Sequence, residues 1–375
     1  MDSLSKSLSV QAIRGTAATL VVLLHVCTMS SFGKNQWGAY AYNFFLQFGA
    51  FGVDIFFVVS GVITAGLLRQ KQADHPLHSL QFFVRRFVRI YPIYWLSLGA
   101  TIAVSLGSSG LYPVDFSQLT LRNIGLLTTS PLHPLSWTLC NEIQFYLVAG
   151  LAMLFGRRSG PAIAVWGAAH IVAVIAAGRG WDRGWYFATP ITLEFLPGLL
   201  IGYIAPRLSL PLPRAGMVLG CIIVAVAGFY AAQPLGTTTG LLRVAVYGTA
   251  ASLIVWGALS VERAGWRPAE WLTFLGDISY SSYMWHWPIM IAVSLLFGAW
   301  LSRSAGVVLY ILSTGICVLI ASWASHRWIE RPSTRWAGSL FRRSGQSGSM
   351  APSSPVAVAP LPAPALPNGL AVQQT

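Results

Sequence analysis

Residues 44–68 read FFLQFGAFGVDIFFVVSGVITAGLL, a long apolar run that contains one charged side chain, Asp54. A helix needs about 20 mostly apolar residues to cross a bilayer, so this run predicts a membrane-spanning helix. Similar runs recur from Val10 to Trp328 with short polar breaks between them. We expect about ten spanning helices, near residues 10–31, 44–68, 90–107, 136–156, 161–178, 185–204, 215–233, 238–259, 271–299 and 305–326.

The composition of the whole chain agrees with this interpretation. Of 375 residues, 55% are hydrophobic and only 9% are charged, whereas a soluble globular protein is about one quarter charged. The chain therefore predicts an all-α integral membrane protein with one membrane domain, residues 1–337. The remaining residues, 338–375, are rich in Ser, Gly, Ala and Pro and cannot bury enough surface to fold, so we expect a disordered cytoplasmic tail.

The positive charge of the chain, +13 in total, lies mostly between the apolar runs. An even number of helices places both termini on one side of the membrane. With a cytoplasmic N-terminus, seventeen Lys and Arg residues fall inside and six outside, as the positive-inside rule requires. The basic residues thus indicate topology and contact with membrane lipid, and they do not predict nucleic-acid binding.

Five ionisable side chains lie within the predicted spans: His25, Asp54, Glu142, Glu194 and His286. Each costs about 2.5 to 3.5 kcal/mol at mid-bilayer on insertion scales and is a functional candidate for that reason. Any single one could instead be a structural contact between helices. Five of them in ten helices predict a buried polar site.

The first expected helix carries two polar residues in register, Arg14 and His25. Eleven steps of 100° return to within about 20° of the same face, and the rise between the two is about 16 Å. Arg14 would lie at the cytoplasmic surface and His25 in the outer third of the membrane. This spacing suits a long donor with an anionic end and a reactive tip, such as a coenzyme A thioester. The alternative is that Arg14 is only a positive-inside anchor.

His25, Glu142 and Asp54 are expected at similar depths below the outer surface. A histidine beside a carboxylate can act as a general base, because the carboxylate orients the ring and stabilises the imidazolium. We therefore expect these three residues to be catalytic. The oxyanion that acyl transfer creates needs hydrogen-bond donors, and the candidates are Trp137, Asn141 and Tyr146. The seven histidines show no metal-ligand spacing, so we expect no metal.

The segment from Gln81 to Pro92 places Arg85, Arg86 and Arg89 among aromatic residues just before the third expected helix. Such a cluster can bind phosphates and an adenine ring. We assign it, with Arg14, to donor binding. The alternative is an interfacial basic stretch that contacts anionic lipid.

Taken in order, the motifs of the chain resemble those of the membrane-bound acyltransferase family 3, which includes bacterial exopolysaccharide and O-antigen acetyltransferases. The motifs are Ile13-Arg-Gly with His25, Phe51-Gly-Val-Asp-Ile-Phe-Phe-Val-Val-Ser-Gly, Arg85-Arg-Phe-Val-Arg-Ile-Tyr-Pro-Ile-Tyr-Trp, Ser136-Trp-Thr-Leu-Cys-Asn-Glu-Ile-Gln-Phe-Tyr, Leu193-Glu-Phe-Leu-Pro-Gly, Leu275-Gly-Asp-Ile-Ser-Tyr-Ser-Ser-Tyr-Met-Trp-His-Trp-Pro and Glu330-Arg-Pro.

The resemblance implies acyl-CoA, most simply acetyl-CoA, as co-substrate, no bound cofactor, His25 as the catalytic residue and Arg14 as a donor-binding residue. The implied acceptor is a hydroxyl of a carbohydrate or lipid-linked saccharide, and the implied location is the bacterial inner membrane. Direct transfer and an acyl-His25 intermediate both remain open. A multi-pass transporter or lipid-linked-saccharide flippase is the main alternative, because mid-membrane charges also mark substrate paths.

Overall fold

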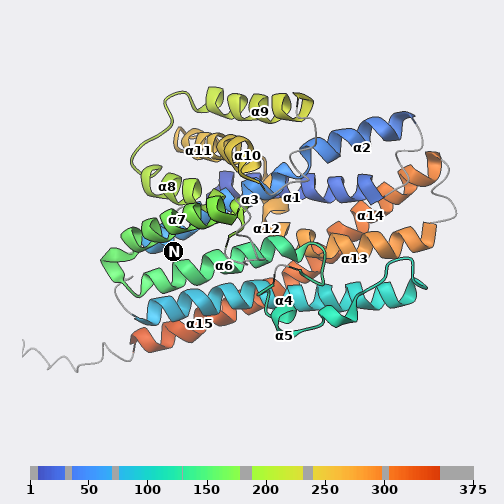
Figure 1. The fold of residues 1–375 in the computed structure, drawn as a ribbon, viewed down its shortest axis with the longest axis horizontal. Helices are drawn as coiled ribbons and strands as arrows, with labels where there is room; N and C mark the ends of the chain where they lie inside the picture. Colours follow the sequence, from blue (N-terminus) through green and yellow to red (C-terminus); the bar gives the residue numbers. More distant parts are fainter. Residues whose placement is uncertain are drawn as a thin grey trace, which may run out of the picture.

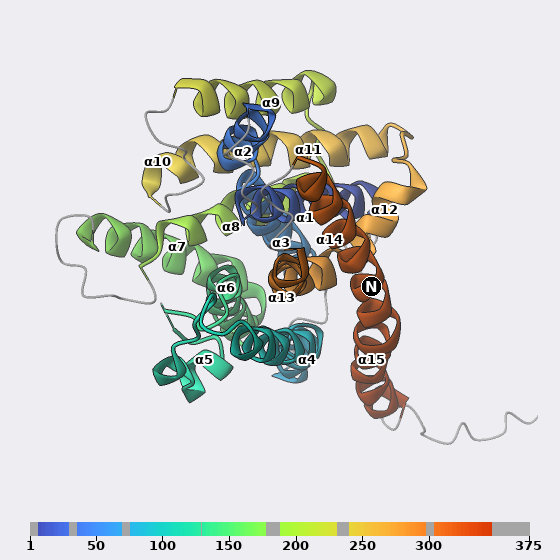
Figure 2. The same cartoon turned by 90° about the vertical axis from the view of Figure 1, so that its right-hand side faces the viewer.

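The computed structural model describes residues 7–29, 36–69, 76–128, 130–177, 188–230, 240–297 and 304–346. Throughout these ranges the chain is helical or irregular, with no strand. α1 (Leu8–Met29), α3 (Phe51–Leu68) and α13 (Ser279–Phe297) lie in the middle of the bundle, as Figure 2 shows. The predicted all-α class is confirmed.

The other helices surround these three. α4 runs beside α6 along the long axis, while α9 and α11 pack together on the opposite side of the bundle (Figure 1). The bounds of these surrounding helices are α2 (Gln36–Phe48), α4 (Pro76–Gly107), α6 (Ser136–Met153), α7 (Ser159–Ala176), α8 (Phe195–Ile204), α9 (Pro213–Tyr230), α11 (Thr249–Arg263), α12 (Glu270–Asp277), α14 (Ser304–Ser325) and α15 (Arg331–Gln346). The short turns are η3 (Phe116–Gln118), α5 (Leu121–Ile124), η4 (Gly156–Arg158), η6 (Pro190–Glu194), α10 (Leu241–Arg243), and the π-helical turns η8 (Val244–Gly248) and η9 (His326–Glu330).

Seven helical segments in the described ranges are long and apolar enough to cross a membrane. They are Leu8–Thr28, Tyr42–Leu68, Leu77–Gly107, Gly156–Ala176, Pro213–Tyr230, Leu241–Arg263 and Gly306–Phe341. The remaining three expected spans also correspond to helices, namely α6, η6 with α8, and α13. They fall outside the group of seven because they are shorter or carry more polar side chains. Among the described residues, seven of the ten expected spans are thus clear candidates, and the count of ten stays a prediction.

Three features of the helices differ from the sequence prediction. α2 precedes α3, where we expected one helix. α4 begins at Pro76, so the arginine cluster lies inside one long helix and not ahead of it. α15 extends to Gln346, past Gly338, where the tail was expected to begin. Residues 347–375 lie outside the described ranges, so the tail and its boundary remain predictions.

Small residues allow α3 and α8 to approach closely. A Cβ atom added at Gly198 would lie 2.1 Å from the carbonyl oxygen of Val58, and one added at Gly61 would lie 2.3 Å from that of Phe195. Either distance is far inside van der Waals contact. Glycine is therefore required at this crossing, as is common where helices pack inside membranes.

The start of α1 is held by a carboxylate from α11. Glu262 accepts hydrogen bonds from the backbone nitrogens of Leu8, at 2.9 Å, and Ser9, at 3.1 Å, and from the Ser7 hydroxyl. These N–H groups have no partner within their own helix, and a negative charge at a helix N-terminus is favourable. The cap fixes the helix that carries Arg14 and His25.

Candidate active site

α1 positions two of the predicted site residues on one rigid element. The helix is continuous from Leu8 to Met29, so Arg14 and His25 are about 16 Å apart along its axis. The Arg14 side chain is 7% exposed, and its Nη1 donates to Oε1 of Gln11 at 3.1 Å. A Cβ atom at Gly276 would lie 2.0 Å from the backbone oxygen of Gln11. That glycine allows α12 to pack directly on the Arg14 end of α1.

A cavity opens beside Arg14 between α1, α3, α4, α6 and α13. Its polar side chains come from these five helices, and apolar residues of α3, α4 and α6 complete the walls. The polar lining consists of Arg14, Ser60, Arg86, Arg89, Thr138, Glu142, Tyr146, Tyr280 and Tyr283. Three guanidinium groups thus face one small space that holds a single carboxylate, Glu142.

The charges around this cavity are not balanced by ion pairs. Glu142 accepts from the hydroxyls of Ser60, at 3.0 Å, and Tyr146. Arg86 lies over the Tyr146 ring, with 4.4 Å from Cζ to the ring centroid. Among the described residues, no carboxylate oxygen lies within ion-pair distance of Arg14, Arg86 or Arg89. Buried cations without a paired anion are costly, so the arrangement is suited to an anionic ligand.

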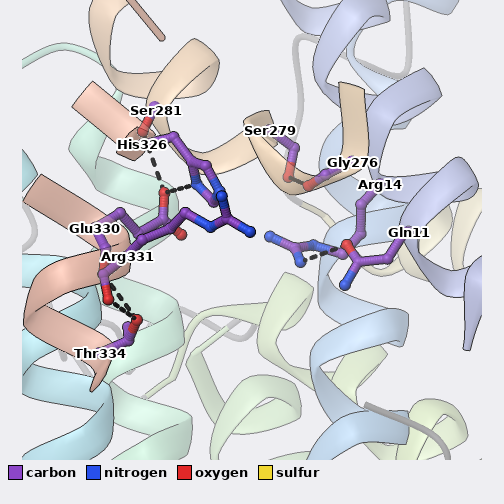
Figure 3. Close-up of polar contacts among 9 residues, drawn as sticks. All are labelled: Gln11, Arg14, Gly276, Ser279, Ser281, His326, Glu330, Arg331 and Thr334. Atoms are coloured by element: carbon purple, nitrogen blue, oxygen red, sulfur yellow. Dashed lines mark hydrogen bonds and ion pairs between the residues drawn. The ribbon is translucent and has the colours of Figure 1, made fainter. Parts of the chain in front are cut away.

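A further polar cluster borders Arg14 from η9 and α15. Glu330 accepts from Ser281 Oγ at 3.2 Å, and its carboxylate is 3.1 Å from Nδ1 of His326. In Figure 3 the guanidinium group of Arg331 points toward that of Arg14. Glu330 lies near enough to act electrostatically on Arg14 and Arg89. The cytoplasmic end expected for α1 is therefore strongly cationic, with Glu330 as partial compensation.

His25 has a different partner from the one expected. Its Nδ1 lies 2.8 Å from the carbonyl oxygen of Val21 and 3.3 Å from Nε2 of His286. The ring also meets Trp287 edge-on, with 5.7 Å between centroids. The described residues place no carboxylate among these contacts. The structure thus pairs His25 with a second histidine.

Tyr283 lies between the arginine cavity and the histidine pair. Its ring lines the cavity and is 5.9 Å from the ring of His286, centroid to centroid. Its hydroxyl donates to the backbone oxygen of Leu135 at 3.0 Å and is 2.7 Å from Oγ1 of Thr138. These hydrogen bonds thus hold the Tyr283 side chain where the arginine cavity meets the histidine pair.

The structure brings some of the predicted residues together and separates others. Glu142 and Tyr146 join Arg14 in the cavity and do not contact His25. Arg86 and Arg89 face the cavity, whereas Arg85 is exposed. The other two residues predicted as oxyanion donors, Trp137 and Asn141, do not line the cavity. The amide nitrogen of Asn141 donates to the backbone oxygen of Trp137 at 2.8 Å, and Trp137 packs against the core.

Asp54 lies away from His25, in a buried ion pair. Nε and Nη2 of Arg243 donate to its two carboxylate oxygens at 2.9 and 2.8 Å, and the two side chains are 1% and 0% exposed. Arg243 is one of the six basic residues counted as outside from the sequence, and it was not predicted as a partner of Asp54. The sequence feature that could have predicted this pair is Arg243 itself, a lone arginine at the start of an apolar run, because the buried Asp54 needs a cation as partner.

Glu194 completes this cluster. It is fully buried, it lies close enough to Asp54 and Arg243 to interact electrostatically with both, and its side chain packs beside Gly248 of η8. The bidentate bonds of Arg243 go to Asp54. Asp54 and Glu194 therefore belong to a helix-to-helix contact. The predicted place of Asp54 beside His25 is not supported by the geometry, and Glu194, predicted as a polar-site candidate, lies with Asp54 instead.

Together the fold and the site define a helical membrane protein with a buried cationic cavity and a histidine pair on a shared helix. A family profile described as an acyltransferase domain matches residues 7–324. The chain therefore belongs to this acyltransferase family, which confirms the resemblance found in its motifs.

Two curated relatives illustrate what the family contains. The exopolysaccharide production protein ExoZ of Rhizobium meliloti is 31% identical over 311 residues, which cover 76% of this chain and 90% of that protein. The peptidoglycan O-acetyltransferase OatA of Listeria monocytogenes is 28% identical over 298 residues, 67% of this chain and 47% of that protein.

A third relative, the O-acetyltransferase OatA of Staphylococcus aureus, is 24% identical over 322 residues, 76% of this chain and 53% of that protein. The chain thus spans about half the length of the two OatA proteins and most of ExoZ. No solved structure matches the chain.

Proposed function

We propose that this protein transfers an acetyl group from acetyl-CoA, bound from the cytoplasm, to a hydroxyl of an exported or cell-surface carbohydrate. The observation that carries the proposal is the placement of three arginines without ion pairs at one end of α1 and a histidine with an available ring nitrogen at the other. Membership of an acyltransferase family favours an enzyme over a transporter or flippase.

The arginine cavity supplies the donor end of this proposal. Acetyl-CoA has several phosphate charges at one end and its thioester at the end of a long flexible arm. Arg14 and Arg86 are at least nine-tenths buried, and a guanidinium group binds phosphate with strong charge-assisted hydrogen bonds. Anchoring the phosphates here offsets the cost of burying the guanidinium groups. The arm would then extend along α1, past Tyr283, toward His25.

His25 supplies the chemistry at the other end. The acceptor O–H bond breaks as its proton moves to Nε2 of His25, and the oxygen bonds to the carbonyl carbon of the thioester. The C–S bond then breaks, and the departing thiolate takes the proton from Nε2. The step is balanced and leaves His25 in its starting form. Tyr146 lies at the arginine end, so the geometry does not support it as an oxyanion donor beside His25.

The relatives suggest the class of acceptor. ExoZ is named for exopolysaccharide production, and both OatA proteins are named as O-acetyltransferases. A polysaccharide or its lipid-linked precursor is the acceptor that we propose for this chain. ExoZ is the nearest match in length among the three, which favours an exopolysaccharide over peptidoglycan.

A transfer assay tests this function. Protein purified in detergent, or reconstituted in vesicles, is incubated with acetyl-CoA radiolabelled in the acetyl group and with polysaccharide from a deletion strain. We expect label to move to the polysaccharide in an alkali-labile ester. Mass spectrometry of the polysaccharide from the deletion strain and its parent should show loss of an acetyl group. Unchanged polysaccharide together with no transfer would refute the proposal.

We also propose ten crossings with both termini cytoplasmic, in the bacterial inner membrane. Figure 1 places the start of α1 and the end of α15 toward the same end of the bundle, as an even number of crossings requires. Reporter fusions at Arg158 and after Gln346 should therefore read cytoplasmic, and a fusion at Ser109 periplasmic, because the charge asymmetry sets the orientation. Opposite readings for Arg158 and Gln346 would contradict the ten-crossing topology.

Two adjacent arginines of α4 provide a matched test of donor binding. Arg86→Ala should raise KM for acetyl-CoA about 10-fold or more, because a charge-assisted contact contributes about 1.5 to 3 kcal/mol. Arg85 is exposed and does not line the cavity, so Arg85→Ala should leave KM within about twofold. Steady-state kinetics on equal amounts of folded protein measure both. Equal effects of the two substitutions would show that the cavity does not bind the donor.

A further inference from the structure

We infer that His286 of α13 is the positioning residue of His25, holding its ring and stabilising the positive charge that it gains during transfer. The inference rests on the proposed function, in which His25 is the general base. In many hydrolases a carboxylate orients the catalytic histidine. In this site the hydrogen bonds assign that role to a neutral imidazole and a backbone carbonyl.

The carbonyl contacts fix which nitrogen of each ring carries the proton. A carbonyl oxygen only accepts hydrogen bonds, so Nδ1 of His25, 2.8 Å from the Val21 oxygen, must carry a hydrogen. Nδ1 of His286 lies 3.1 Å from the oxygen of Ser282 and must likewise carry one. Nε2 of each neutral ring is then an acceptor. The 3.3 Å contact is therefore a donation from Nδ1–H of His25 to Nε2 of His286, shared with the Val21 oxygen.

This pattern leaves one ring nitrogen for chemistry. Both nitrogens of His286 are engaged, and its side chain is 0% exposed. His25 is partly exposed, and in the part of the chain that the structure describes its Nε2 has no hydrogen-bond partner. The ring that can reach a substrate is His25. His286 acts through His25 and does not itself touch the reacting atoms.

His286 stabilises the charged intermediate form of His25. When Nε2 takes the acceptor proton, Nδ1–H becomes a stronger donor, and its bonds to the Val21 oxygen and to His286 strengthen. A buried carboxylate in the same position would itself cost several kcal/mol inside a membrane. It would also stabilise the imidazolium before the substrate arrives. A neutral acceptor supports the charge only when it forms.

Two substitutions of His286 separate positioning from packing. His286→Leu removes the acceptor and should lower kcat about 10- to 100-fold, the usual contribution of a group that orients a functional histidine. His286→Gln places an amide oxygen where Nε2 was and should restore most of this loss. KM for acetyl-CoA should change by less than about threefold in both, because the donor is anchored at Arg14. His170→Leu, at a buried histidine of α7, is the control for removing a buried imidazole.

A double substitution decides whether His286 acts through His25. In a His25→Ala background, His286→Leu should cause no further loss of kcat, because residues that act as a unit are strongly non-additive. A further 10-fold loss there, an equal effect of His286→Leu and His286→Gln, or normal kcat in His286→Leu would each overturn the inference. If the unsubstituted protein transfers no acetyl group, the proposed function itself fails, which is a distinct outcome.

Discussion

His25→Ala is expected to lower kcat about 10²- to 10⁴-fold, the contribution of a positioned general base. The substituted protein should still insert and still bind acetyl-CoA, because the donor is anchored about 16 Å away at Arg14. Binding can be measured by equilibrium dialysis with labelled acetyl-CoA, and kcat by the transfer assay on equal amounts of folded protein. The result would place the chemical step at the outer end of α1.

Arg14→Ala is the matched control, since it changes the other end of the same helix. It should raise KM for acetyl-CoA with a smaller change in kcat, provided that the phosphate contacts act equally in ground and transition states. If both residues only held the bundle together, both substitutions would reduce the amount of folded protein and leave turnover per folded molecule unchanged. Near-normal kcat in His25→Ala would overturn the mechanism.

The second large effect is expected at the Asp54–Arg243 ion pair, and it concerns folding. Asp54→Asn removes the charge that balances Arg243, whose side chain is 1% exposed. Breaking a buried pair from one side costs about 3 to 5 kcal/mol, because the remaining charge stays buried. We expect most of the Asp54→Asn protein to be lost before purification. Yield of monodisperse protein and its thermal midpoint in detergent measure the effect.

Glu194→Gln provides the control for this ion pair. Glu194 is equally buried and lies beside the same arginine, yet the bidentate hydrogen bonds of Arg243 go to Asp54. Replacing it with an isosteric neutral side chain should therefore preserve yield and turnover. An Asp54→Asn protein of normal yield but without turnover would restore Asp54 to the catalytic residues. Equal losses of yield in both variants would show that the two carboxyl groups share the charge of Arg243.

Much of the fold was predictable because a membrane protein encodes its helices in composition. Apolar runs of bilayer length identify the ranges of α1, α7, α9 and α14 with small errors at the ends, and they identify the end of α3. The break between α2 and α3 was not predicted, because the apolar run continues across it. The length of α15 was not predicted either, because its Arg, Ser and Gly residues are typical of a polar tail.

The site was only partly predictable, because depth in the membrane does not determine contact. Helical register placed Arg14 and His25 on one face of α1. Depth alone suggested Glu142 as the partner of His25, whereas packing turns Glu142 toward the arginines and brings His286 to His25. Which pair meets depends on the rotation and crossing of α6 and α13 against α1. A single sequence does not contain that information.

The cap of Glu262 on the start of α1 links regions that are far apart in the sequence. Because α1 is a single continuous helix held at its first turn, the number of residues between Arg14 and His25 determines both the reach and the orientation of the site. One inserted residue would turn His25 by about 100° relative to Arg14, while four would nearly restore the orientation and lengthen the span by about 6 Å. If the protein has the function proposed above, the ten residues between the two side chains therefore set the length of donor that fits.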